Sequence, residues 1–291
     1  MAIKDWGKFI ALGLIWGSSF FWIKIAVQEI GPFTLVSFRV LFALLGILAV
    51  IAYRRTALPG RRRWWAFGVL GLFNVALPFV LISWAEQNIS SGIAAILNST
   101  MPLFTILIAP LFLADERITR ARMVGLVLGF LGVVVLVSGK IEFGLGGYQL
   151  GVAAMLIASL CYAVSAIFAR KQTQGMAVEA QSIGQMMAAW LFIIPATAMV
   201  EAPFTPPALP ITWMAVAWLG LLGSCVATLL YYSLINSVGP TRTVLVSYIF
   251  PLVGVVLGII FLNERPDWQL VVGGFLIIGG IGMVNRRQSN G

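Results

Sequence analysis

The sequence has few groups that ionise. Its 291 residues include no histidine, and only 10% of them are charged. No Asp or Glu lies near the middle of a long apolar run, and the chain has no HxxxH, DxxxD or Ser/His pairing. Metal-assisted and acid–base catalysis depend on such groups, so we expect no enzyme, no catalytic residue, no metal and no cofactor. The two cysteines, Cys161 and Cys225, both lie in apolar runs and are expected to pack there without forming a disulfide.

Apolar residues are correspondingly abundant. They make up 60% of the chain, and the mean hydropathy is +0.99, whereas a soluble domain has about 45–50% apolar and about 25% charged residues. The apolar excess extends from end to end, which indicates an all-α polytopic membrane protein. The sequence predicts ten transmembrane helices, at residues 6–27, 33–53, 64–85, 91–113, 121–138, 148–169, 178–200, 212–234, 241–262 and 268–285.

The basic residues are unevenly divided between the two sides of this arrangement. If the chain starts inside, the outside segments carry only Lys140 and Arg265, while Lys24 and Arg39 lie within spans. Every other Lys and Arg is then on the inside, which predicts that both termini are cytoplasmic in a bacterial inner membrane. The pI of about 10.1 then reflects basic residues that set the topology and face the lipid bilayer. We therefore expect no nucleic-acid partner.

One sequence motif, called the repeated phrase below, occurs twice in the chain. Residues 102–132 and 251–280 both begin with Pro and contain Glu-Arg, at Glu116 and Glu264, with Gly nine and sixteen residues after the Glu. Each predicted half has five spans, an odd number, so the second half must be inverted in the membrane. Duplicated halves are typical of transporters, which bind substrate between them. The predicted repeats are residues 1–143 and 144–291.

Shorter matches support the duplication. At an offset of 146 residues, Trp16 aligns with Tyr162 and Arg39 with Gln185. We therefore expect Trp16 and Tyr162 to face the axis that relates the two halves.

These residues resemble the ten-helix EamA branch of the drug/metabolite transporter superfamily. The resemblance rests on Ile15-Trp16-Gly17-Ser18-Ser19, on Ser37-Phe38-Arg39-Val40 and on the two repeated phrases. Within the branch the chain is most similar to YddG-type amino-acid exporters. The first phrase departs slightly, with fourteen residues from Pro102 to Glu116 against thirteen in the second copy, and a bulge at Pro110 would absorb the extra residue.

Prolines mark where the predicted helices should bend. A proline within a helix frees the carbonyl four residues earlier, and for Pro78, Pro102 and Pro251 this carbonyl belongs to Asn74, Asn98 and Ser247. Free backbone at membrane depth is tolerated where protein or a water-filled cavity satisfies it. We expect three hinges at a substrate cavity; the alternative is a structural kink whose Asn or Ser bonds a neighbouring helix.

Aromatic and small polar residues complete the predicted cavity. Rings deep in spans would line it unless they only pack helices together, and serines would contact substrate unless they bond the carbonyl four residues earlier. The predicted cavity residues are Trp16, Ser19, Asn74, Phe79, Ser83, Asn98, Tyr162, Ser165, Tyr232, Ser247 and Tyr248.

Two charged residues have a separate prediction. We expect Arg39 to form a structural or gating ion pair, with Glu29 or Glu86, rather than to bind a substrate carboxylate. Because no acidic residue lies at the middle of a predicted span, Glu86 is the best remaining candidate for a residue that couples transport to protons. The glycines at 125 and 129 allow close helix approach, within a monomer or, as the alternative, across a dimer.

These predictions lead to one functional hypothesis. The expected cavity is aromatic and apolar with neutral hydrogen-bonding groups, which suits a neutral or zwitterionic small molecule. With the resemblance, this implies an exporter of small metabolites, chiefly amino acids including aromatic ones, working by alternating access without a buried proton relay. The alternative is an efflux pump for cationic or other drugs, although cation recognition favours a buried acid that the spans lack.

Overall fold

The computed structural model describes residues 3–56, 63–112, 120–138, 146–173, 175–203, 205–238 and 243–284. Within these ranges the regular structure is entirely helical. Four helices run unbroken: α1 (Ile3–Ala26), α2 (Pro32–Arg54), α8 (Gly147–Gln172) and α9 (Val178–Val200). The elbow at Glu116-Arg117 lies outside the described residues.

Four other segments change helix type along their length or stop and restart. They are α3 (Trp64–Leu70), the π-helix η2 (Gly71–Ala76) and α4 (Leu77–Ala85); α5 (Ser91–Asn98) and α6 (Met101–Phe112); α10 (Pro210–Ala217), the π-helix η3 (Trp218–Val226) and α11 (Ala227–Val238); and the 3-10 helix η4 (Val244–Tyr248) with α13 (Ile249–Leu262). Two further helices are α7 (Arg120–Ser138) and α14 (Trp268–Val284).

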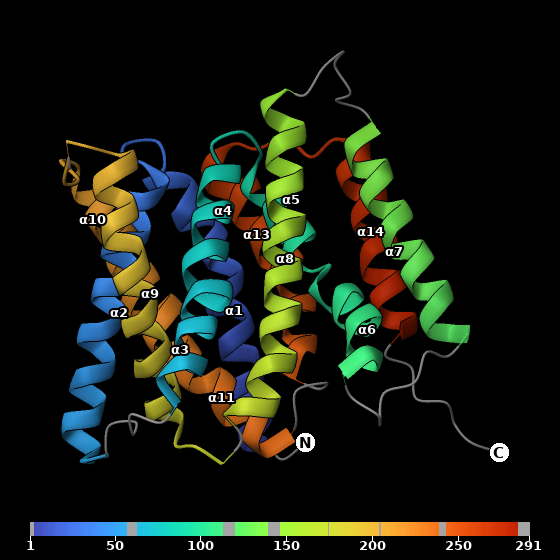
Figure 1. Ribbon diagram of the computed structural model, residues 1–291. Helices are drawn as coiled ribbons and strands as arrows, with labels where there is room; N and C mark the ends of the chain where they lie inside the picture. Colours follow the sequence, from blue (N-terminus) through green and yellow to red (C-terminus); the bar gives the residue numbers. More distant parts are fainter. Residues whose placement is uncertain are drawn as a thin grey trace.

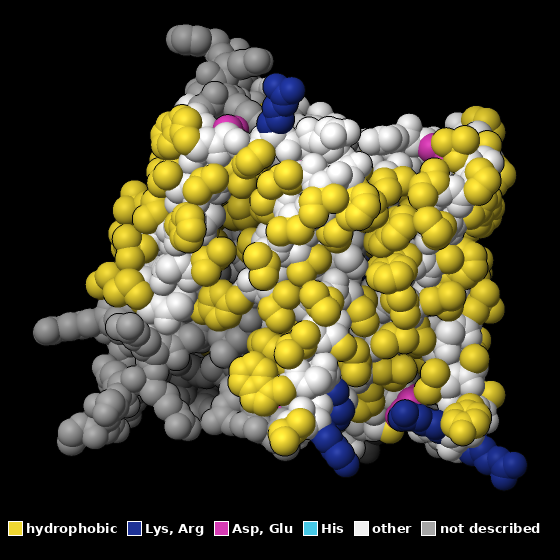
Figure 2. Space-filling view, turned by 180° about the vertical axis from the view of Figure 1, so that it is seen from behind, with side chains coloured by type: hydrophobic (Ala, Val, Ile, Leu, Met, Phe, Trp, Pro, Cys, Tyr) yellow, Lys and Arg dark blue, Asp and Glu magenta, His cyan; other side chains and the backbone are white. Residues whose placement is uncertain are grey.

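The helices have the length and composition of membrane spans. Seven continuous helical stretches among the described residues are long and apolar enough to cross a bilayer, and shorter apolar helices cover Met123–Leu136, Val246–Leu262 and Trp268–Gly280. On the face seen in Figure 2, apolar side chains cover the middle of the bundle, and the Lys and Arg side chains lie toward its ends. A polytopic helical membrane protein is thus confirmed.

Each of the three predicted hinge prolines follows a departure from α-helical geometry. Pro78 follows the π-helix η2, Pro102 follows the break between α5 and α6, and Pro251 follows the 3-10 helix η4. At the second break, the hydroxyls of Ser99 and Thr100 donate to the carbonyls of Ile96 and Leu97, at 2.6 Å each. The same two carbonyls also accept the backbone N–H groups of Ser99 and Thr100, so side chains reinforce the turn at which the helix is interrupted.

The sequence did not predict the second π-helix, η3, yet it lies where the repeat would place it. Adding the offset of 146 residues to Gly71–Ala76 gives residues 217–222, which overlap η3 at Trp218–Val226. π-helical turns are rare and often occur at functional sites. Two of them at matched positions are independent evidence for the duplication.

Helix α1 packs against α13, α11, α10 and α5. α2 lies against α9 and η3, and α8 against α4 and α6. α7 and α14 lie side by side at one edge of the bundle, beyond α13 (Figure 1).

The α7–α14 pair is held by backbone contact at glycines. A methyl group at Gly280 would lie 2.4 Å from the Gly125 carbonyl oxygen and 2.7 Å from the Gly129 nitrogen. At the adjacent Gly279 it would meet nothing within 4 Å. The glycines of the repeated phrase therefore pack against one another within one chain.

We expect Gly280→Ala to force α7 and α14 apart, because the atoms in its way are backbone atoms that cannot rotate aside. Overpacking of this kind costs about 1–3 kcal/mol, which thermal unfolding of the purified protein would detect. Gly279→Ala is the matched control and should leave the stability unchanged or slightly raised. Equal stability of the two variants would contradict the contact.

Candidate transport cavity

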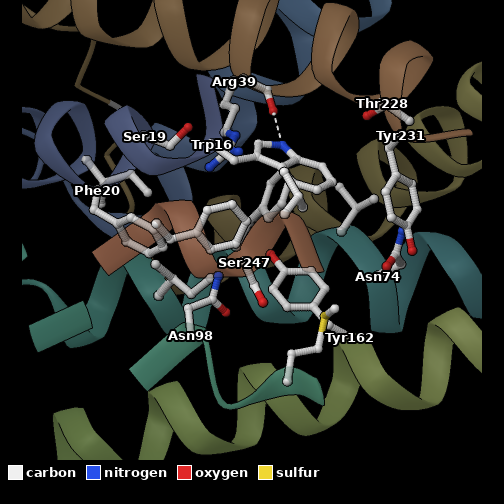
Figure 3. Close-up of a pocket in the computed structure, with 18 of the residues that line it drawn as sticks. Trp16, Ser19, Phe20, Arg39, Asn74, Asn98, Tyr162, Thr228, Tyr231 and Ser247 are labelled. Atoms are coloured by element: carbon white, nitrogen blue, oxygen red, sulfur yellow. Dashed lines mark hydrogen bonds between the residues drawn. The ribbon is translucent and has the colours of Figure 1, made fainter. Parts of the chain in front are cut away.

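A cavity lies at the centre of the bundle, where broken helices from both halves of the chain meet. Helices α1, α2, α8 and α9 contribute lining residues, and so do η2, α4, α5, η3, α11, η4 and α13. Eight of the residues singled out from the sequence line it: Trp16, Ser19, Arg39, Asn74, Phe79, Asn98, Tyr162 and Ser247. In Figure 3, Ser19, Arg39 and Trp16 lie on one side, with Asn98, Ser247 and Tyr162 opposite.

Four predicted cavity residues are not in this lining. Ser83 and Ser165 are buried, and neither hydroxyl has a hydrogen-bond partner among the described residues. Tyr232 is buried and bonds Gln185, and Tyr248 is half-buried. The prolines and Glu86 also lie outside the lining.

The sequence reasoning omitted several residues from its predicted cavity. Phe20, Tyr231 and Phe250 add three rings, and Gln185 and Thr228 add two polar groups. For Gln185 a signal existed, because the repeat aligns it with Arg39. Both members of that pair and both members of the Trp16–Tyr162 pair line the cavity.

The Trp16 side of the cavity is an aromatic cluster anchored to the π-helix. The Trp16 Nε1 donates to the Gly223 carbonyl in η3 at 3.0 Å. Its ring lies 5.3 Å from the ring of Tyr231 and 6.1 Å from that of Phe250, between centroids. Separations of this size allow favourable edge and tilted contacts, so the cluster presents fixed ring surfaces to the cavity.

The polar groups at the cavity include a small network. Gln185 Oε1 accepts from Asn74 Nδ2 at 3.0 Å and from the Tyr232 hydroxyl at 3.2 Å. Asn74 thus bonds a neighbouring helix and lines the cavity as well. Ser19 donates to the Ile15 carbonyl four residues earlier, at 3.1 Å, which is the alternative expected for serine.

The expected ion pair of Arg39 is not formed. Among the described residues the only ion pair is between Arg54 and Glu179. Arg39 is 4% exposed, its Nε donates to Ser224 Oγ at 2.8 Å, and its guanidinium lies 3.6 Å from the centre of the Phe79 ring. The prediction of a partner in Glu29 or Glu86 was wrong, because Glu29 bonds the start of α10 and Glu86 lies outside the cavity.

Three glutamates join the two halves at the far end of the bundle, which we define as the end where α1 finishes. Each accepts backbone N–H groups at the start of a helix from the other half. Glu264 accepts from Ser91 and Gly92 of α5, at 2.7 and 3.2 Å. Glu201 accepts from Phe33 and Thr34 of α2, at 2.9 and 2.8 Å.

The third glutamate is Glu29, which follows α1 and contacts the start of α10. It accepts from the backbone of Ala208 and Leu209 and from the Thr212 hydroxyl. The Thr212 hydrogen bond lowers the pKa of Glu29 against the opposing effect of burial, so the contact is lost only when the pH falls through that lowered value. A carboxylate at a helix start is stabilised by free N–H groups and the helix dipole.

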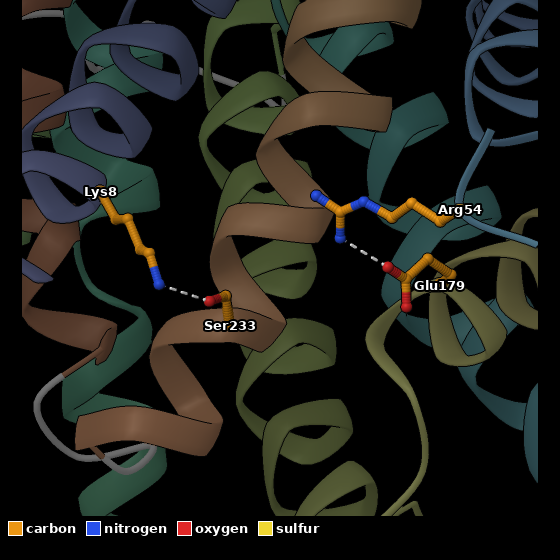
Figure 4. Close-up of polar contacts among 4 residues, drawn as sticks. All are labelled: Lys8, Arg54, Glu179 and Ser233. Atoms are coloured by element: carbon orange, nitrogen blue, oxygen red, sulfur yellow. Dashed lines mark hydrogen bonds and ion pairs between the residues drawn. The ribbon is translucent and has the colours of Figure 1, made fainter. Parts of the chain in front are cut away.

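The near end, where α1 begins, is held differently. Lys8 donates to Ser233 at 2.8 Å, and Arg54 pairs with Glu179 at 2.7 Å (Figure 4). At this end the contacts depend on basic side chains, whereas at the far end they depend on carboxylates.

Comparison with known proteins agrees with this architecture. The sequence model of the EamA-like transporter family matches residues 7–138 and again residues 149–286. The chain belongs to the EamA-like transporter family. Two matches in tandem cover most of the chain and coincide with the two halves that carry the repeated phrase.

Relatives in this family are named as transporters. The inner membrane transporter YedA of Escherichia coli is 33% identical over 87% of this chain and 81% of its own. A transporter of Archaeoglobus fulgidus is 28% identical over 94% and 95% of the two chains, and the protein PecM of Dickeya dadantii is 25% identical over 99% and 96%. A crystal structure with a TM-score of 0.72 and 20% identity covers 98% of both chains and shows the same fold.

The chain is therefore a multi-pass inner-membrane transporter and not an enzyme.

Proposed function

We propose that this family member exports small neutral or zwitterionic metabolites, chiefly amino acids including aromatic ones, as YddG-type exporters do. One observation carries the proposal: among the described residues that line it, the central cavity combines six aromatic side chains with neutral amides and hydroxyls and has no acidic residue. An apolar body can pack on the rings while a few placed polar groups fix its orientation.

We also propose the topology on which such transport depends. Ten spans would form two inverted repeats, residues 1–143 and 144–291, with both termini in the cytoplasm. The paired family matches and the π-helices at matched positions support the duplication. The far end is then the outer end, and alternating access rocks one half against the other. The three glutamate contacts at helix starts would hold the outer end closed in this conformation.

The energy source follows from the same cavity. No described residue of the lining carries a carboxyl group, and the chain has no histidine, so the substrate gradient would drive export without a proton relay. The alternative, efflux of cationic drugs, would require an acid in the cavity. Gly132 of α7 and Gly273 and Gly280 of α14 face glycine backbone of the other helix, which supports a monomer over a dimer through these contacts.

Flux into proteoliposomes tests this function. A panel of labelled amino acids and organic cations is offered with and without a pH gradient. We expect saturable amino-acid flux that is independent of the gradient. Flux of cations alone would overturn the proposal, and abolition of a pH-dependent signal by Glu86→Gln would overturn the absence of a proton relay.

A further inference from the structure

Among the residues that the structure describes, Arg39 is the only charged one that lines the cavity, and it is buried without an acidic partner there. A buried charge is costly unless it is paired. A cation that forms no ion pair inside a transporter therefore points to a ligand that supplies the opposite charge.

The guanidinium of Arg39 is held in one orientation. Ser224 Oγ accepts from Nε, and the Phe79 ring covers one face. The two terminal nitrogens donate to no residue that the structure describes. They are the pair of donors that bind a carboxylate in the two-pronged geometry typical of arginine.

The remaining lining tells which molecule would carry this carboxylate. Trp16, Phe20, Tyr231 and Phe250 offer ring surfaces for an apolar body, and Asn98 and Ser247 offer neutral polar groups. The described part of the lining offers no carboxylate to pair with an amine. An ammonium could lie against an aromatic ring at a gain of about 0.5–2 kcal/mol. This gain is small compared with that of pairing a carboxylate with the buried charge of Arg39.

The nearest competing counter-ion is Glu86. Its two carboxyl oxygens are buried and bond no described residue, and Lys24, with its Nζ donating to the Glu86 and Ile89 carbonyl oxygens at 2.5 and 2.9 Å, is a closer cation. Glu86 makes no ion-pair contact with Arg39 and does not line the cavity. It therefore leaves the terminal nitrogens of Arg39 open to a ligand.

We propose that Arg39 binds the carboxylate of the transported molecule and that the substrate class is an aromatic monocarboxylate, in which the amino group is not required. This inference rests on the proposed function, names the residue that binds the carboxylate of an amino acid, and extends the substrate class to the anionic des-amino acids. Amino acids fit because they carry the carboxylate, and their des-amino analogues should fit as well.

Three probes separate the two ends of an amino acid. Phenylalanine has both groups, 3-phenylpropanoate lacks the amine and phenethylamine lacks the carboxylate. Binding is measured by the thermal stability of the purified protein, which does not depend on flux. We expect both acids to stabilise the wild type and the amine to have no effect. In Arg39→Gln the affinity for both acids should fall about 10–100-fold, as for loss of one hydrogen bond to a charged group.

Two further variants keep the test decisive. If Arg39→Gln does not fold, Arg39→Lys takes its place in the test. Arg39→Lys retains the charge and should bind both acids with an intermediate affinity. Arg54→Gln makes the same substitution outside the cavity, at the ion pair with Glu179, and should leave acid binding unchanged. Stabilisation by phenethylamine, undiminished acid binding in both Arg39 variants, or no acid binding by the wild type would overturn the inference. Saturable amino-acid flux in the liposome panel would still support the proposed function in each case.

Discussion

Replacing Glu264 with Gln is expected to open the far end of the cavity. The carboxylate accepts two backbone N–H groups from the first turn of α5, and hydrogen bonds to a charged group are worth about 1.5–3 kcal/mol. Gln keeps one acceptor but loses the charge and its attraction to the helix start. Since 1.4 kcal/mol corresponds to tenfold in a population, the closed form should lose about tenfold in stability relative to the open one.

Labelling of a cysteine in the cavity measures this shift. Ser19→Cys would be made in a chain with Cys161 and Cys225 replaced, and a thiol reagent that cannot cross the bilayer would be applied to each side in turn. We expect Glu264→Gln to raise labelling from the far side about tenfold. Glu179→Gln, which breaks a contact at the near end, is the matched control and should not raise far-side labelling. An unchanged rate in Glu264→Gln would show that the contact does not hold the cavity closed.

Replacing Gln185 with Leu should have the largest effect on stability. Gln185 is 1% exposed and is the acceptor for both Asn74 and Tyr232. Its removal leaves two donors without a partner, at about 1–3 kcal/mol for each buried group. We expect thermal unfolding at a temperature lower by roughly 5 °C or more, together with loss of transport.

A second substitution tests whether the lost acceptor is the cause. Tyr232→Phe removes one of the donors, so adding it to Gln185→Leu should restore part of the stability, although Tyr232→Phe alone should lower it. Removal of both partners is often nearly neutral, whereas removal of one is costly. If the double variant is less stable than Gln185→Leu, the network does not account for the loss.

The helical segments and the cavity pairs could be read from the sequence because each depends on local pattern. The predicted spans 33–53 and 178–200 differ by a residue or less from α2 and α9, since apolar length and flanking charge bound a membrane helix. The repeat alignment paired Trp16 with Tyr162, and both residues line the cavity.

The residues that the sequence misplaced depend on helix rotation and on distant contacts. Ser83 and Ser165 are buried polar residues of predicted spans, as Ser19 and Ser247 are, yet only the second pair lines the cavity. Nothing in a local pattern tells which side of a helix faces the other half when most sides are apolar. The partner of Arg39 was predicted wrongly for a related reason, because Ser224 lies 185 positions away.

The sequence by itself determined a polytopic helical protein with few charged residues, because composition and hydropathy record these directly. Only the tertiary structure decided that Glu29, Glu201 and Glu264 bond the starts of helices from the other half and that Arg39 forms no ion pair within the described part of the chain. The physical reason is that a hydrogen bond or an ion pair requires a partner within a few ångströms. For side chains more than a hundred residues apart, only the packing of the helices brings that partner near.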